Sequence, residues 1–194
     1  YLANRQELDP ALEIFRQLPH EDSTPQNELI RELLRTAQGL GRYAEAREVW
    51  SVLRAIAGLP AGTPGNLIEN GGFEQEPLGE RYPALGDGGR GFDWQLTRHP
   101  EVVARRDDER PAGGKRSLFV SFTMGMTTPF ANLSQLVLVE PGQRYSLTFQ
   151  VRTRNIPAAP LLPPAIGIVD AQRPETLSLR VPIPAGSGEW QPVS

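Results

Sequence analysis

Residues that carry out enzymatic chemistry are scarce and scattered in this 194-residue sequence. The two histidines, His20 and His99, lie far apart along the chain without the spacing of metal ligands. The absence of cysteine excludes both a disulfide framework and a thiolate metal site. The sequence also lacks a Gly-x-Ser-x-Gly nucleophile motif, a phosphate-binding loop and a His-Glu-x-x-His zinc motif. We therefore predict that the protein is not an enzyme.

Charge and hydropathy exclude two further classes of function. The densest group of charges, residues 105–110 (RRDDER), mixes both signs, which is typical of a solvated loop. The net charge is −3, and no basic face stands out, so we predict no binding to nucleic acid. The sequence contains no run of about 18 apolar residues, so we predict no membrane span within it. Arginine outnumbers lysine 19 to 1, which favours a GC-rich bacterial source.

The first 60 residues carry apolar side chains at helical spacing in three segments. Asp9 and Pro10 predict the N-cap and first residue of a helix that ends before Pro19. A second helix is expected from Ser23-Thr24-Pro25 to Gly39, and a third from residue 43 to Gly58. The residues expected on the inner faces of the first and third helices are Ala11, Ile14, Phe15 and Leu18, and Ala46, Val49, Trp50, Leu53 and Ile56.

These two inner faces repeat after 35 residues. A period near 34 with helix–turn–helix units is typical of tetratricopeptide repeats. Residues 34–46, with Leu34, Ala37, Gly39, Tyr43 and Ala46 in place, resemble the junction between the two helices of that repeat. The resemblance covers about one and a half repeats and implies a surface that binds proteins or peptides. Because such stacks need three or more units, we expect either further repeats before Tyr1 or capping by the β-rich part. The alternative is that the helices only pack against the β-rich part.

Short strand patterns separated by glycine and proline replace the helical pattern after residue 65. In the segment 66–74 (NLIENGGFE), a short strand at 66–69 is expected to turn through Asn70-Gly71-Gly72, whose residues tolerate left-handed backbone, and to deliver Phe73 inward. Many short strands without helices between them predict an antiparallel sandwich or jelly roll. The later strands are expected at residues 92–96, 101–105, 117–122, 133–139, 145–151, 165–169 and 176–183, and from Trp190 onward.

The order of these β elements resembles a known family. Residues 66–74, then Trp94, then the motifs at 114–120, 135–151 and 190–193 are similar to carbohydrate-binding modules of families 4, 9 and 22. The resemblance implies a galactose-binding-like jelly roll that is non-catalytic and binds sugar chains. It places Trp94, Trp190, Phe73 and Tyr145 mainly at core positions.

The same resemblance suggests where ligands would bind. Three ring-bearing side chains in expected loops, Tyr82, His99 and Phe130, are candidates for a sugar-binding platform. Many family members hold a structural calcium near the glycine-rich turn. Here Glu74 could supply one carboxylate, and Asp107 or Asp108 another, because calcium prefers oxygen ligands. The alternative for Glu74 is that it accepts backbone N–H bonds within the turn.

Together these observations predict an α+β multidomain chain. The expected parts are a helical segment at residues 1–60, a linker at 61–65 and a β-sandwich at 66–194, with further chain expected beyond both ends. We predict a glycan- or polysaccharide-binding module joined to a helical scaffold that binds a protein partner. The location implied is periplasmic, cell-envelope or extracellular, such as bacterial envelope or exopolysaccharide machinery. The alternative is a structural scaffold whose β-sandwich binds no sugar.

Overall fold

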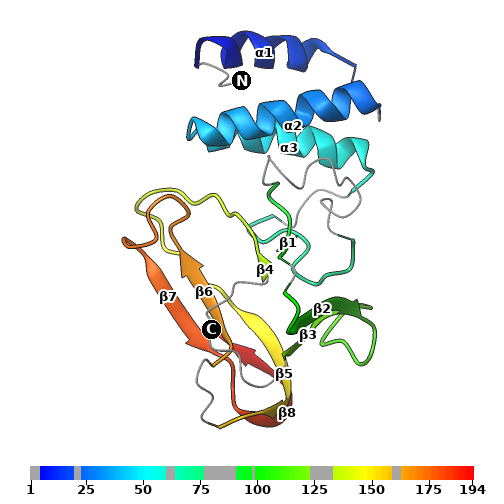
Figure 1. Cartoon of the computed structure of the whole chain (residues 1–194), viewed down its shortest axis with the longest axis vertical. Helices are drawn as coiled ribbons and strands as arrows, with labels where there is room; N and C mark the ends of the chain where they lie inside the picture. Colours follow the sequence, from blue (N-terminus) through cyan, green and yellow to red (C-terminus); the bar gives the residue numbers. More distant parts are fainter. Residues whose placement is uncertain are drawn as a thin grey trace. The chain divides into compact units, whose positions relative to one another are not determined.

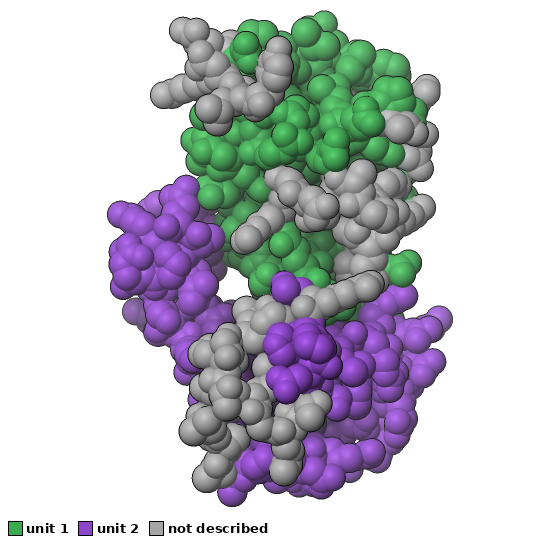
Figure 2. Space-filling model, viewed as in Figure 1, with its two compact units in different colours: residues 1–96, 133–138 green, residues 97–132, 139–194 purple. Residues whose placement is uncertain are grey.

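The computed structural model describes residues 5–19, 23–59, 64–76, 91–97, 99–122, 133–158 and 163–194. The chain divides into two compact units (Figure 2). The helical unit comprises residues 1–96 and 133–138, and the strand unit comprises residues 97–132 and 139–194. Residues 64–76, 91–96 and 133–138 thus belong with the helices, while the predicted division at 61–65 stays a prediction. The predicted α+β class is confirmed, since helices come first and strands follow.

Three helices make up the N-terminal part of the described chain (Figure 1). They are α1 (Arg5–Gln17), α2 (Thr24–Gly39) and α3 (Tyr43–Ile56). The start of α2 agrees with prediction, with Ser23 as N-cap and Pro25 in the first turn, where a missing N–H costs nothing. The loop between α2 and α3 is short, so the two helices form an antiparallel pair. Helix α2 packs against both α1 and α3.

The prediction for α1 was wrong in its start and in its buried face. The helix begins at Arg5 rather than at Asp9, and Pro10 lies inside it. Burial of Leu8 explains the longer helix, because it offsets the hydrogen bond that Pro10 cannot donate. The buried side chains of α1 are Leu8, Leu12 and Phe15, whereas Ile14 and Leu18, predicted to face inward, are exposed.

The hydrophobic core that the structure describes lies in the helical unit. Trp50 of α3 is fully buried and packs against Phe92, with ring centroids 6.5 Å apart. A Cβ on Gly91 would lie 2.3 Å from the Trp50 ring, so a larger residue at 91 would displace the indole. The buried apolar side chains are Leu8, Leu12, Phe15, Ile30, Leu33, Leu34, Ala37, Ala46, Val49, Trp50, Leu53 and Phe92.

The strands form antiparallel pairs. In the helical unit β1 (Gln95–Leu96) pairs with β4 (Leu133–Ser134). In the strand unit β2 (Val102–Asp107) pairs with β3 (Ser117–Phe122), β5 (Phe149–Ile156) with β8 (Gly186–Val193), and β6 (Ala165–Val169) with β7 (Ser178–Pro182) (Figure 1). Within the described residues these pairs stay separate two-stranded ladders. A closed sandwich or jelly roll therefore remains a prediction.

Several strand predictions agree with the structure. The strands predicted at 117–122 and 165–169 have those bounds, and β2, β7 and β8 lie within a few residues of prediction. The patterns at 133–139 and 145–151 become regular strand only at 133–134 and from Phe149 onward. The predicted strand at 66–69 is absent: the backbone turns there, and the Asn66 side-chain carbonyl accepts the N–H of Ile68 at 3.0 Å.

Candidate functional site

The glycine-rich turn at 70–75 is closed by its asparagine. The Asn70 side chain donates to the carbonyl of Gln75 at 2.8 Å and accepts the N–H of the same residue at 3.1 Å. Positive φ occurs at Asn70, as expected, and also at Phe73 rather than at the glycines between them. The Phe73 ring stacks on Trp94, with centroids 5.1 Å apart.

Of the three predicted sugar-binding residues, the structure describes only His99. Tyr82 and Phe130 lie outside the described residues. His99 is half-buried, and its Nδ1 accepts the N–H of Glu101 at 3.2 Å within a turn. Its backbone also forms a bridge with Val102. The Nδ1 atom of His99 is therefore occupied by the turn that leads into β2.

The predicted calcium ligands make other contacts in the structure. Glu74 is exposed and belongs to the helical unit, while Asp107 and Asp108 belong to the strand unit. Asp107 is buried at the end of β2 and forms an ion pair with Arg105, and Asp108 accepts from Arg116 at 3.4 Å. The described residues contain no group of three or more His, Asp or Glu side chains that could hold a metal ion. The calcium site thus stays a prediction.

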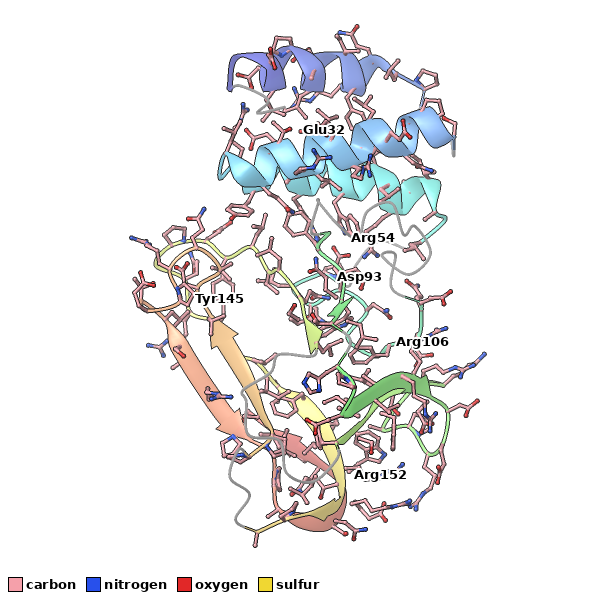
Figure 3. The ribbon with its side chains drawn as sticks, viewed as in Figure 1. Glu32, Arg54, Asp93, Arg106, Tyr145 and Arg152 are labelled. Atoms are coloured by element: carbon pink, nitrogen blue, oxygen red, sulfur yellow. The ribbon has the colours of Figure 1, made fainter. Side chains whose placement is uncertain are left out.

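A buried carboxylate attaches the segment 66–74 to α3. Glu69 is only 4% exposed, and it forms ion pairs with Arg47 and with Arg54, of which Figure 3 labels Arg54. Its carboxylate also accepts the indole N–H of Trp50 at 3.2 Å. The Gln135 side chain completes the arrangement by pairing with the backbone N–H and carbonyl of Glu69, at 3.0 and 2.8 Å. Two arginines and the indole N–H thus surround this carboxylate and join the segment to α3.

A groove lies between α1 and α2, with a volume of about 360 Å³. Its base is apolar, and charged side chains stand at its margin, where Glu32 pairs with Arg35 at 2.7 Å. Figure 3 labels Glu32 on the side of α2 that faces α1. The residues lining the groove are Glu7, Leu8, Ala11, Leu29, Glu32, Leu33, Arg35 and Thr36.

Two exposed apolar side chains, Ile14 and Leu18, lie at the C-terminal end of α1. Positions 7, 11 and 14 share one side of α1 because they are three or four residues apart, and Leu18 directly follows the last residue of the helix. Ile14 is 60% exposed and Leu18 is 39% exposed, although both were predicted to be buried. Their equivalents one repeat later, Val49 and Leu53, are each 0% exposed. Of the repeated apolar positions, Phe15 is buried like Trp50, whereas Ile14 and Leu18 are exposed and their equivalents on α3 are not.

Ion pairs hold α1 against α3. Arg16 donates from two nitrogens to the two carboxylate oxygens of Glu48, at 2.7 and 2.8 Å, and Arg42 pairs with Asp9 and Glu45. The hydrogen bond from Arg16 lowers the pKa of Glu48, and the one from Arg42 lowers the pKa of Glu45. Because α1 also buries one side in the core, its outer stripe is presented in a fixed orientation.

Comparison of the chain with protein-family models, curated proteins and solved structures finds no match. None of the described helices has the length and hydropathy needed to cross a membrane. The candidate site is therefore defined by the geometry of α1 and α2.

Sequence reasoning missed both the groove and the buried carboxylate. The 35-residue repeat identified apolar positions of α1 but did not show which of these side chains are exposed. For Glu69, two signals were present: an acidic residue directly after Leu67 and Ile68, and two arginines seven residues apart on one side of α3.

Proposed function

We propose that this chain is a non-catalytic protein-interaction scaffold that binds a partner protein through its helical unit. The observation that carries the proposal is the exposure of Ile14 and Leu18 beside an apolar groove, at positions whose repeat equivalents are fully buried. The resemblance of these helices to tetratricopeptide repeats supports the same function.

A protein partner suits this surface better than a small molecule. Ala11 lines the groove, and the exposed side chains of Ile14 and Leu18 follow it three and seven residues later in the sequence. Small-molecule sites are instead concave and enclose most of the ligand surface. Contiguous exposed apolar surface on a rigid element is typical of a protein-binding site.

Site-directed photocrosslinking tests the proposal. The chain has no cysteine, so Ile14→Cys gives one attachment point for a benzophenone maleimide. Val139→Cys is the matched control, because Val139 is also 60% exposed but lies in the strand unit. In an extract of the source cells, we expect a discrete adduct from position 14 and not from 139. The partner identified by mass spectrometry, once purified, should bind the unmodified chain. Identical adducts from both positions would contradict the proposal.

Glycan binding by the strand unit is a second candidate, and one observation favours it. Tyr145, expected mainly in the core, is 47% exposed (Figure 3), and an exposed aromatic ring can stack on a sugar. A glycan array with and without calcium tests this function. Selective binding that Tyr145→Ala, Tyr82→Ala or Phe130→Ala weakens would support it, and no binding by the folded chain would refute it.

A further inference from the structure

We propose that Asn70 is a site of spontaneous covalent modification, at which the side-chain amide becomes a carboxylate through a ring formed with the backbone nitrogen of Gly71. The closed glycine-rich turn at 70–75 holds this reaction back, so that it proceeds only when the turn opens. The inference goes beyond the proposed protein-binding function and does not depend on it, because it rests on the chemistry of one residue pair and on the hydrogen bonds around it.

Asn70 and Gly71 form a reactive pair because the second residue has no side chain. Among the asparagines of the sequence, only Asn70 is followed by glycine. Attack of the Gly71 nitrogen on Cγ of Asn70 closes a succinimide ring, and glycine has no Cβ to hinder that approach. Gly71 is exposed, so hydroxide can reach its N–H. The pair therefore combines an unhindered nucleophile with an adjacent amide.

The reaction needs no reagent other than water. Hydroxide removes the proton from the Gly71 nitrogen, this nitrogen forms a bond to Cγ of Asn70, and the bond from Cγ to the side-chain nitrogen breaks, so that ammonia leaves. Water then opens the ring. Addition at Cγ gives aspartate, whereas addition at the backbone carbonyl gives isoaspartate, in which the main chain runs through Cγ. The net change is amide plus water to carboxylate plus ammonium, without oxidation or reduction.

Two hydrogen bonds restrain the Asn70 amide in the closed turn. Its nitrogen, the leaving group, donates to the carbonyl of Gln75 at 2.8 Å, and its oxygen accepts the N–H of the same residue at 3.1 Å. Closing the ring moves Cγ toward the Gly71 nitrogen and makes this planar atom tetrahedral, so we expect both bonds to break first. Because one such bond shifts an equilibrium by about two- to tenfold, the two together should slow the reaction by about fourfold to a hundredfold.

The modification is expected to loosen the segment that joins α3. Residue 70 directly follows Glu69, whose buried carboxylate pairs with Arg47 and Arg54. Either product replaces an amide that donates to the carbonyl of Gln75 with a carboxylate that repels it. Isoaspartate also lengthens the main chain, and the backbone carbonyl that accepts the indole N–H of Trp94 at 3.1 Å becomes a free carboxylate. Hydrogen exchange across residues 66–76 should therefore be faster after modification.

Ageing of the 194-residue chain at mildly alkaline pH, followed by digestion and quantitative mass spectrometry, tests the inference. Samples are aged in buffer, where the fold is intact, and in guanidinium chloride, where it is lost. Asn66 is the matched internal control, because it lies in the same segment, is exposed and precedes Leu67 rather than glycine. Circular dichroism verifies the fold of the variants Gly71→Ala and Trp94→Phe.

In denaturant, we expect Asn70 to react at least about tenfold faster than Asn66, to give both aspartate and isoaspartate, and to react faster as pH rises. Gly71→Ala should slow the reaction several-fold, because its methyl group hinders the attacking nitrogen. In buffer, the wild-type chain should react about fourfold to a hundredfold more slowly than in denaturant. Trp94→Phe removes the indole donor, so it should speed the reaction in buffer and leave it unchanged in denaturant.

Four results would overturn the inference. Equal rates at Asn70 and Asn66 in denaturant would show that the pair is not reactive, and equal rates at Asn70 in buffer and in denaturant would show that the turn does not restrain it. Aspartate without isoaspartate would exclude the ring. No modified Asn70 in the folded chain after about a hundred of the half-times measured in denaturant would exclude the site in the native protein. None of these results bears on the protein-binding function, which the position-14 crosslink tests separately.

Discussion

Helices α1 and α3 carry the same apolar pattern 35 residues apart, yet Val49 and Leu53 are buried while their equivalents Ile14 and Leu18 are exposed. Helix α3 packs against α2, and it also contacts Glu69 and Phe92 from the segments that follow. Helix α1 has α2 as a neighbour and ion pairs to α3, but no described segment covers Ile14. A repeated sequence pattern thus sets which positions are apolar, and the neighbouring elements determine whether those side chains are buried or exposed.

The largest expected effect contrasts two repeat-equivalent leucines. Leu53→Ala should lower the free energy of unfolding by about 2–5 kcal/mol, because it removes a fully buried side chain and leaves a cavity. Leu18→Ala should cost less than about 1 kcal/mol, since Leu18 is partly in solvent. Urea unfolding of both variants measures the contrast, and equal costs would show that the two helices are enclosed to the same extent.

The buried carboxylate provides the next contrast. Glu69→Ala should cost about 2–3 kcal/mol, because Arg54 and the Trp50 indole lose their acceptor in a buried setting. The value falls below that of a fully buried pair because Arg47 is partly exposed. Glu74→Ala, at an exposed position of the same segment, should change stability by less than about 0.5 kcal/mol. A similar loss in both variants would contradict the role given to Glu69.

Gly91 tests how tightly α3 is covered. Gly91→Ala should cost about 1–2 kcal/mol, because the new methyl group would overlap the Trp50 ring. Gly113→Ala is the control, since its Cβ would meet open space. The fluorescence of Trp50 should change with the first variant and not with the second. A neutral effect of Gly91→Ala would mean that the indole can move aside.

The smallest expected effect comes from the α1–α3 ion pairs. Because the hydrogen bond from Arg16 lowers the pKa of folded Glu48 below 4.5, its stabilising contribution is present above pH 4.5. This contribution is lost as pH falls through the folded pKa. Glu48→Gln should therefore flatten the acid limb of stability against pH, while Glu28→Gln, on an exposed position of α2, should leave it unchanged. Parallel acid limbs in wild type and Glu48→Gln would contradict this assignment.

The sequence predicted the elements whose causes are local. Helix α2 follows from Pro25, the apolar spacing and the glycine at its end, and β3 and β6 follow from alternation within short segments. The start of α1 was mispredicted because burial of Leu8, a tertiary effect, outweighed the signal of Asp9 and Pro10.

Features that depend on distant residues escaped prediction. Periodicity could not tell which of two adjacent apolar stripes on α1 faces the core. The regular strand β4 ends at Ser134, and the side chain of the next residue, Gln135, bonds to the backbone of Glu69, 66 residues earlier. The contact of Glu69 with α3 was missed because it also joins residues that are far apart in the sequence. The candidate site could thus be predicted as a set of apolar positions but not as an open surface.

Thiol labelling at positions 14 and 49 tests the central claim most directly. In this cysteine-free chain, Ile14→Cys should react rapidly with a thiol reagent, whereas Val49→Cys should react only as fast as the chain opens. Val139→Cys, at an equally exposed position of the strand unit, is the control and should also react rapidly. Slow labelling of Ile14→Cys would contradict an open surface on α1.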